Sequence, residues 1–312
     1  AASDVYKRQP LGPNVNTKFP DYAPFLSPDE QMLVFTSRRE GSAGNDKDPY
    51  ERYYEDIFFC KREGDEWSKA KPFSVNINTM THDAGVTFAP DGGIIFYRTD
   101  EKKTGGDLYI SHRTTDDWQE AKILTGRINS EYCEASACFS PNGGMIIFSS
   151  DKPGGYGGKD LWYSLYDKKT KSFGTPVNLG KDINTWGDEM YPFLHEDGSL
   201  YFSSNAHLGM GGLDIFKAES KGDGQWGNVT NMKYPINSAG DDFGIIFEED
   251  KDRGYFSSNR EGTKGADDIW SFVLPPICCI FEGYITDCEF NGTVPGVIVK
   301  LSGSDGSLTE VK

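Results

Sequence analysis

The sequence lacks long apolar runs and a surplus of basic residues, and each absence excludes a class of protein. No run of roughly 18 apolar residues occurs, so no membrane-spanning helix is predicted. Lysine and arginine number 32 against 48 aspartates and glutamates, which gives a net charge of −16. Because phosphate binding needs a basic surface, we expect no nucleic-acid partner. No window shows sustained apolar spacing at about 3.6 residues, so helices are not predicted.

Metal-binding and catalytic motifs are also missing. The four histidines are scattered, with no HExxH pair and no evident nucleophile partner: His82, His112, His195 and His207. The six cysteines lack the paired CxxC spacing of a zinc site: Cys60, Cys133, Cys138, Cys278, Cys279 and Cys288. We therefore predict neither a metal nor a cofactor. A disulfide from Cys288 to Cys278 or Cys279 is one possibility in an oxidising compartment, and buried free thiols are the other.

Glycine is abundant, with 36 residues, and one glycine-rich stretch has the composition of a phosphate-binding loop. Residues 209–212 read GMGG. A phosphate loop needs a strand before it and a helix after it, because the helix N-terminus supplies the N–H groups. Here the short apolar run 213–217 follows, which favours a strand. The pattern also recurs along the chain, so we interpret these glycines as turn residues between two strands.

The chain contains five repeats. Each is marked by an aspartate at the start of an apolar strand, with spacings of 51, 53, 54 and 54 residues: Asp56, Asp107, Asp160, Asp214 and Asp268. An aromatic strand and a turn precede each aspartate, and an Asn-Thr or Asn-Ser signature follows the first four. Four short strands in a repeat of about 50 residues are typical of a propeller blade. The sequence thus predicts an all-β, five-bladed β-propeller over residues 9–274.

The two ends of the propeller are predicted to close the ring together. The fifth repeat stops after its third strand, at residues 268–273, without the Asn-Thr/Ser signature. Residues 9–17 resemble the fourth strand and signature of the third repeat, at residues 175–185. We expect this N-terminal segment to complete the fifth blade, which would remove exposed sheet edges. Residues 1–8 fit no part of the repeat and are interpreted as a non-native or disordered tail.

The pattern changes near the C-terminus. Residues 284–286 and 297–301 alternate apolar and polar side chains, with Asn291-Gly292 between them, which predicts a β-hairpin. We interpret residues 277–312 as the truncated start of a separate β-sandwich. Because such a sandwich needs about seven strands, the natural chain is expected to continue.

The repeat carries two sets of acids on one predicted face. Besides the five aspartates above, an acid stands four residues after each Asn-Thr/Ser signature: Asp21, Asp83, Glu134, Glu189 and Asp242. We interpret all ten as structural acids that cap repeated turns; a ring that binds calcium or an amine is the alternative. Glycosidases need two or three unlike carboxylates at the channel mouth. Because these acids are equivalent, we predict no catalytic residues and no enzymatic activity.

One loop departs from the repeat. The first blade inserts a longer segment before its third strand, and this segment carries Tyr50, Arg52, Tyr53 and Tyr54. Tyrosine and arginine dominate binding hot spots because they offer large rigid area and fixed hydrogen bonds. We predict that these four side chains bind a partner. The alternative is a loop whose tyrosines pack on their own blade.

Several strings together resemble a known family. They are DYAPFLSPDE, DKPGGYGGKDLWY, NLGKDINT, DEMYPFLHEDGSLYFSSNAHLGMGGLDIF and the closing GYITD and VPGVIVKL. Over about residues 9–312 the chain is similar to the TolB-type, WD-repeat-like propeller of Bacteroidota OmpA-family envelope proteins, and most to the PorE-like components of the type IX secretion system. The resemblance also implies that the C-terminal piece is of the carboxypeptidase-regulatory-like type.

The resemblance implies a function and a location. It implies a non-catalytic protein-interaction scaffold in the periplasm, associated with the outer membrane. The implied partners are envelope or secretion-system proteins, and peptidoglycan only through a domain absent from this chain. A five-bladed propeller that binds carbohydrate or processes glycosides is the rival hypothesis.

Overall fold

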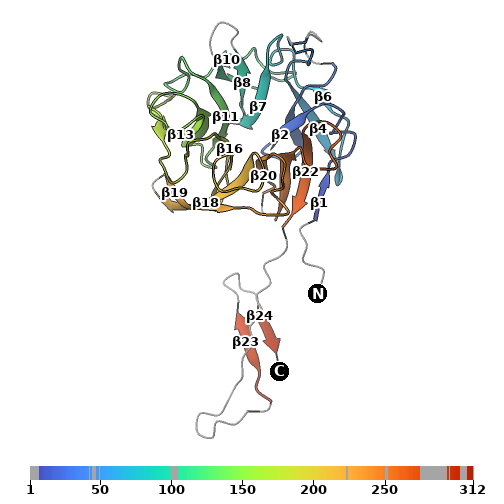
Figure 1. Ribbon diagram of the computed structural model, residues 1–312, viewed down its shortest axis with the longest axis vertical. Coiled ribbons are helices and arrows are strands. Elements are labelled where there is room, and N and C mark those ends of the chain that lie inside the picture. The colour runs from blue at the N-terminus through green and yellow to red at the C-terminus, as the bar shows by residue number, and fades with distance from the viewer. Residues whose placement is uncertain are drawn as a thin grey trace. The chain divides into compact units, whose positions relative to one another are not determined.

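The computed structural model describes residues 7–41, 43, 47–48, 50–99, 105–222, 224–249, 252–274, 294, 296–302 and 308–311. The chain divides into two compact units, residues 1–275 and 276–312. Every element in the described residues is a strand, and five sheets surround a common axis (Figure 1), which confirms the all-β, five-bladed propeller. Within these ranges no helix is long and apolar enough to cross a membrane.

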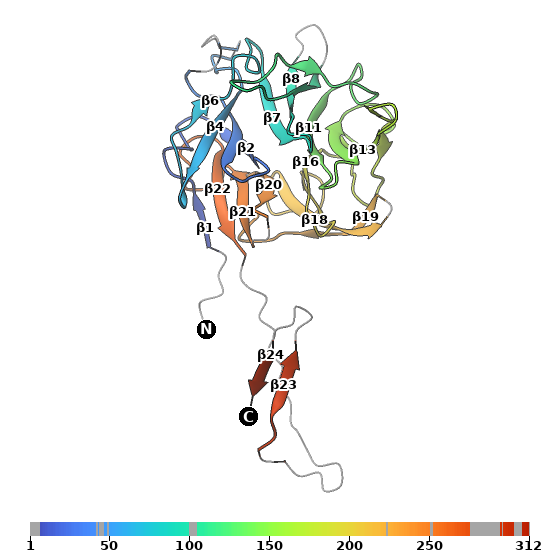
Figure 2. The ribbon, with the colours of Figure 1, turned by 180° about the vertical axis from the view of Figure 1, so that it is seen from behind.

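Each blade begins with an innermost strand that faces the axis of the ring. These strands are β2 (Asp21–Leu26), β7 (Asp83–Phe88), β11 (Glu134–Phe139), β16 (Glu189–Leu194) and β20 (Asp242–Phe247). The second strands pair with them antiparallel: β3 (Met32–Ser37), β8 (Ile94–Thr99), β12 (Met145–Ser150), β17 (Leu200–Ser204) and β21 (Arg253–Ser258). Figures 1 and 2 show the innermost strands grouped around the centre of the ring.

The third and fourth strands lie farther out. The third strands are β4 (Asp56–Glu63), β9 (Gly106–Ser111), β13 (Asp160–Asp167), β18 (Asp214–Gly222) and β22 (Asp268–Val273). The fourth strand is split in blades 1 and 3, into β5 (Glu66–Trp67) and β6 (Lys71–Pro72), and into β14 (Ser172–Phe173) and β15 (Val177–Asn178). Blades 2, 4 and 5 use β10 (Lys122–Ile123), β19 (Gln225–Asn231) and β1 (Lys7–Pro10).

The N-terminal strand closes the ring, as predicted. Strand β1 pairs antiparallel with β22, from Lys7 opposite Val273 to Pro10 opposite Trp270. The strand therefore starts two residues before the predicted segment 9–17. Arg8 belongs to the propeller as well, because its guanidinium donates a 2.6 Å hydrogen bond to the Pro235 carbonyl. Residues 1–6 lie outside the described part of the chain.

The Asn-Thr/Ser signature joins the fourth-strand segment to the third strand of each blade. In the closing blade, the Asn16 side chain accepts a hydrogen bond from the Ile269 N–H and donates one to the Ile269 carbonyl, each 2.9 Å long. The other four signatures repeat this pair of bonds through Asn78, Asn129, Asn184 and Asn237. The repeated asparagine is thus a backbone clamp, and at Asn16 it joins residues far apart in the sequence.

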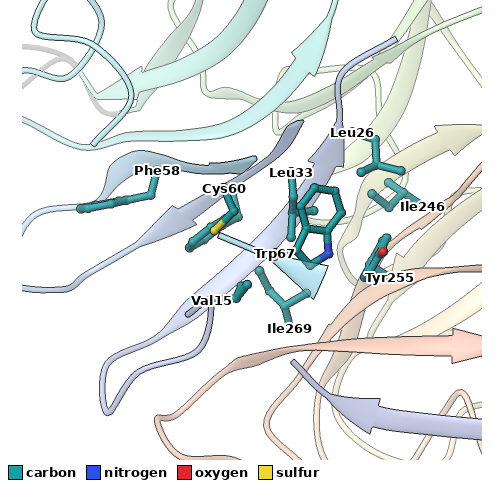
Figure 3. Close-up of a cluster of buried hydrophobic side chains, with 10 residues drawn as sticks. Val15, Leu26, Leu33, Phe58, Cys60, Trp67, Ile246, Tyr255 and Ile269 are labelled. Carbon is teal, nitrogen blue, oxygen red and sulfur yellow. The ribbon is translucent and has the colours of Figure 1, made fainter. Parts of the chain in front are cut away.

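A buried apolar cluster covers the closure (Figure 3). Val15 from the N-terminal segment and Ile269 from β22 belong to the same cluster as Leu33, Cys60 and Trp67 of blade 1. All five side chains are buried. Burying an aliphatic or aromatic side chain of this size stabilises a fold by about 1.5 to 3 kcal/mol. The N-terminal segment therefore contributes packing as well as hydrogen bonds.

The ring has two faces, and aromatic side chains pack at the middle of its axis. We call the end where the innermost strands begin the loop face, since the loops between second and third strands and between blades emerge there. The opposite end, with the turns between first and second strands, is the turn face. At the axis, Tyr191 packs on Phe243 with ring centroids 4.9 Å apart, and Tyr22 packs on Phe243 at 6.0 Å. A void of about 30 Å³ remains, which has room for about one water molecule.

The second unit contains one described hairpin. Strand β23 (Val299–Ser302) pairs antiparallel with β24 (Leu308–Val311). The predicted strand at residues 297–301 therefore overlaps β23, but its partner follows it in the sequence. The predicted partner at residues 284–286, the turn at Asn291-Gly292 and the cysteines Cys278, Cys279 and Cys288 lie outside the described residues.

Candidate binding face of the propeller

The glycine-rich loops pack against the backbone of neighbouring loops. Residues 209–212 lie between β17 and β18, and a Cβ added to Gly211 would come within 2.0 Å of the Gly240 carbonyl oxygen. The equivalent loop of blade 3 repeats this contact, because a Cβ on Gly157 would lie 2.3 Å from the backbone of Trp186. These glycines are therefore required by close approach between adjacent blades.

The first set of acids holds the loops between the second and third strands. All five are buried: Asp56, Asp107, Asp160, Asp214 and Asp268. Asp214 accepts hydrogen bonds from the Met210 and Gly211 N–H groups, at 2.6 and 2.9 Å, and Asp160 accepts one of 2.6 Å from Tyr156. Hydrogen bonds from loop N–H groups to a buried carboxylate are typical of acids that cap turns.

The second set of acids is buried beside basic side chains. Each acid accepts a backbone and a hydroxyl hydrogen bond from the Thr or Ser of the preceding signature. The acids and their basic neighbours are Asp21 with Arg39, Asp83 with Arg98, Glu134 with Lys152, Glu189 with His207 and Asp242 with Arg260. Aspartate thus occurs beside arginine, whereas the longer glutamate occurs beside lysine or histidine, a covariation that sequence reasoning missed.

The two sets of acids influence each other between adjacent blades. Burial raises the pKa of Asp56 to about 7; the Ala43 N–H opposes this rise, and the negative charge of Asp83 in the next blade adds to it. One carboxyl oxygen of Asp56 is buried without a hydrogen-bond partner. Ionised Asp56 is therefore costly to bury.

We expect stability to fall as the pH rises through the titration of Asp56. Its folded pKa of about 7 exceeds the ordinary value of 3.8, so the folded chain binds the proton more tightly. Proton binding to Asp56 therefore stabilises the fold fully below about pH 4, by at most on the order of 4 kcal/mol. This stabilisation is lost as the pH rises from about 4 to about 7. Asp56→Asn should flatten the dependence of melting temperature on pH between 5 and 8. Equal slopes for this variant, the wild type and the exposed control Glu131→Gln would contradict the assignment.

Unlike residues stand at the position just before each strand-three aspartate. They are Glu55, Gly106, Lys159, Leu213 and Asp267. Glu55 accepts a 2.9 Å hydrogen bond from Arg38 and another from the Tyr22 hydroxyl, and lies 3.0 Å from His82 Nδ1. Burial would raise the pKa of Glu55, but the His82 hydrogen bond, the Arg38 charge and the Tyr22 hydrogen bond lower it to about 2.

The pKa of Asp267 is shifted in the opposite direction from that of Glu55. Burial, with the charges of Asp241 and Asp268, raises the pKa of Asp267 to about 6, although Arg38 opposes the shift. Both carboxyls are therefore mainly ionised at neutral pH, but Asp267 takes up a proton at a much higher pH than Glu55. Sequence reasoning compared the repeated acids alone and missed this pair. The residue just before each strand-three aspartate differs between the blades, and this difference could have revealed Glu55 and Asp267.

The predicted binding loop in blade 1 exposes some of its four side chains and packs the others on the propeller. Tyr50 is 77% exposed, and the Arg52 guanidinium lies 5.0 Å from its ring centroid. Arg52 also pairs at 2.9 Å with the buried carboxylate of Asp48. Tyr53 and Tyr54 are half-buried and pack edge-on against Phe19 and His82, with centroids 5.7 and 4.9 Å apart. Two of the four predicted side chains therefore lie exposed, and two pack on the propeller.

The loops of blades 3 and 4 carry four exposed apolar residues. We call this group the loop-face apolar patch and define it as Tyr156, Trp186, Leu208 and Met210, which are 53%, 78%, 95% and 48% exposed. The loops that carry these residues touch: the Gly158 N–H donates a 2.8 Å bond to the Gly187 carbonyl. Sequence reasoning assigned these glycine-rich segments to turns and missed the apolar residues at their tips.

The described thiols are buried, and two histidines pair with carboxylates of the turn face. Cys60, Cys133 and Cys138 are buried free thiols. Histidines His112 and His195 pair with Asp91 and Asp197, at 3.1 and 3.0 Å. Across the described ranges, no three His, Cys, Asp or Glu side chains are grouped so as to hold a metal ion.

Comparisons with known proteins show the fold. No protein-family model matches the chain, and no curated protein matches its sequence. The endo-arabinase of Bacteroides thetaiotaomicron aligns with a TM-score of 0.55 and 12% identity, over 86% of this chain and 98% of the enzyme. The α-L-arabinofuranosidase of Lactobacillus brevis aligns with a TM-score of 0.54 and 13% identity, over 96% and 95%. TolB of Acinetobacter baumannii aligns at 0.48 and 15%, over 83% of this chain and 56% of TolB.

These comparisons correct the prediction that the chain has no enzymatic activity. That prediction is wrong, because structures of similar fold include a family-43 glycoside hydrolase, an α-L-arabinofuranosidase and an endo-arabinase. At these low identities the likeness shows the fold alone. The physical reason for the error is that catalytic acids need not stand at repeated positions, and the pKa values of the non-repeated Glu55 and Asp267 are shifted in opposite directions. The propeller also spans little more than half of TolB.

Proposed function

We propose that this chain is a protein-interaction scaffold of the bacterial periplasm that docks an envelope protein on its loop face. The loop-face apolar patch carries the proposal. Trp186 and Leu208 are among the most exposed large apolar side chains of the described residues. Large apolar side chains that gather on neighbouring exposed loops mark interaction sites in soluble proteins. Aromatic anchors such as Trp186 dominate binding energy in known interfaces.

The finer identity of the scaffold is part of the same proposal. The sequence resemblance to OmpA-family envelope proteins supports an outer-membrane-associated protein, and a partner in the envelope or a secretion system such as the type IX system. The exposed side chains of Tyr50 and Arg52 on blade 1 form a second contact of the same face. Asp48 holds both residues in place through hydrogen bonds.

Substitution of the patch should weaken binding without unfolding the chain. We expect Trp186→Ser with Leu208→Ser to leave the melting temperature unchanged, because both side chains lie in solvent. Loss of aromatic and aliphatic anchors of this type often costs 2 kcal/mol or more, which is roughly thirtyfold in affinity. The partner is first identified by co-purification of the full-length protein from envelope membranes. Its affinity for each variant is then measured by calorimetry.

The control for this experiment changes exposed apolar residues elsewhere. Ile123→Thr with Leu165→Thr alters half-exposed side chains on β10 and β13, away from the loops of the patch. Equal weakening by the control, or no weakening by the patch variant, would overturn docking on this face. A separate variant, Tyr50→Ala with Arg52→Gln, reports on the blade 1 contact.

Glycoside processing is the second candidate, favoured by the unlike carboxylates Glu55 and Asp267 and by the arabinan-degrading enzymes of similar fold. The same purified chain is therefore assayed for release of reducing sugars from arabinan and other plant and bacterial glycans. Hydrolysis that disappears in both Glu55→Gln and Asp267→Asn would replace the scaffold proposal by an enzymatic one.

A further inference from the structure

One cavity of the propeller lies on the turn face. It has a volume of about 480 Å³, within the range of about 300 to 1,000 Å³ that binding pockets occupy. Its wall is built by phenylalanines near the ends of four innermost strands: Phe25 of β2, Phe139 of β11, Phe193 of β16 and Phe247 of β20. We call this cavity the phenylalanine funnel.

The phenylalanines are held in place but remain partly open to solvent. Phe193 and Phe247 pack with ring centroids 6.0 Å apart, and Tyr201 supports Phe247 at 4.9 Å. His195, which pairs with Asp197 at 3.0 Å, lies edge-on to Phe247 at 5.1 Å. All four funnel phenylalanines are half-buried. Phe193 and Phe247 are therefore packed in place, and all four rings present apolar surface to the cavity.

The rim of the funnel is acidic. Carboxylates from three turns line it: Glu30, Glu196, Glu248, Glu249 and Asp252. Glu248 is buried and is neutralised by Arg62 at 3.0 Å and Arg253 at 2.5 Å. Glu196, Glu249 and Asp252 are exposed. Among the described residues that line the funnel, none is a lysine or an arginine.

We propose that the phenylalanine funnel binds a short basic peptide segment that inserts an aromatic or aliphatic side chain beside a lysine or arginine. The apolar wall supplies area for the inserted side chain, and its rings attract a cation. The acidic rim supplies the complementary charge. An anionic lipid surface is repelled by the same rim, and a second copy of this chain, with its net charge of −16, is repelled as well.

This site is separate from the docking proposed for the loop face, since the funnel lies where the innermost strands end. One propeller then carries two independent contacts, one at each end of its axis. The loop-face patch is apolar at its surface, whereas the funnel selects for positive charge. The two sites are distinguishable by the variants that affect them.

Fluorescence anisotropy with a designed probe tests the proposal. The probe is a labelled hexapeptide, Gly-Arg-Trp-Lys-Leu-Gly, blocked at both ends, and we expect saturable binding that weakens with added salt. Replacing Trp and Leu by Ser in the probe should weaken binding at least about tenfold, because the inserted side chains are hot-spot anchors. If this polar probe binds equally well, the apolar wall is not occupied and the proposal fails.

Paired charge-reversal variants locate the binding. Glu196→Lys with Glu249→Lys should weaken binding of the probe at least about tenfold, because two attractive charges become repulsive at the rim. The control Glu131→Lys with Glu261→Lys makes the same change of net charge at exposed loop-face positions, and we expect it to weaken binding at most about twofold. Equal effects of the two variants would show attraction to the overall charge and would overturn the funnel as the site.

The loop-face variants complete the test. Trp186→Ser with Leu208→Ser should bind the probe as the wild type does, and the rim variant should keep the affinity of the envelope partner. A probe that fails to bind the wild type overturns the funnel proposal and leaves the loop-face proposal standing. Loss of probe binding in the loop-face variant would overturn the separation of the two sites.

Discussion

Deletion of residues 1–17 should lower the free energy of unfolding by at least about 4 kcal/mol. The deletion removes strand β1, which forms four residue pairs with β22, and the two Asn16 hydrogen bonds to Ile269. Each such bond contributes about 0.5 to 1.5 kcal/mol net, and burial of Val15 adds about 1.5 kcal/mol or more. The exposed edge of β22 should also promote aggregation.

Urea unfolding followed by circular dichroism measures this effect. The matched control is deletion of residues 1–6, which leaves the whole of β1 in place and should not change the unfolding midpoint. Identical midpoints for the two deletions would show that β1 and the Asn16 clamp do not stabilise the ring.

The second large effect is expected from the buried arginine of the closing blade. Arg260 is 6% exposed, and its guanidinium donates hydrogen bonds to the carboxylate of Asp242 and the carbonyls of Pro235 and Ile236. Lysine cannot reproduce this fork of donors. Because removal of one partner of a buried pair costs about 3 to 5 kcal/mol, Arg260→Lys should cost about 2 to 4 kcal/mol.

The repeat itself supplies a rescue for this substitution. Blade 3 places Glu134 and Lys152 where the closing blade has Asp242 and Arg260. The double variant Arg260→Lys with Asp242→Glu recreates that combination and should recover about 1 to 2 kcal/mol relative to the sum of the single variants. The cycle is measured by equilibrium unfolding. Additive losses would mean that the covariation between blades has no energetic basis.

Much of the propeller was predictable because the repeated residues form hydrogen bonds with the backbone of each blade. The strand-three aspartates cap loops and the signature asparagines clamp strands, so both must recur once per blade. The closing strand was predicted from the missing signature, but its first residues were not. Strand β1 pairs through its backbone, and Lys7 and Arg8 carry no repeat pattern that would have included them.

The candidate sites were less predictable because they arise between repeats. Trp186 precedes β16 and Leu208 follows β17, and close packing of Gly187 against Ala206 brings their segments together. The opposite pKa shifts of Glu55 and Asp267 depend on Arg38 and Asp241, which come from other strands and loops. A comparison restricted to equivalent positions therefore led to the wrong exclusion of enzymatic activity.

The pairing of Lys7 with Val273 also determines how the propeller responds to force. In this antiparallel pair the chain reaches the propeller and leaves it at the same end of the β1–β22 ladder. A pull on the two ends therefore loads the first residue pair alone and peels the strands apart one pair at a time. Ladders loaded in this way open at lower force than ladders that are sheared along their length. If the chain connects anchored parts of an envelope, its ring closure is the element that opens first under tension.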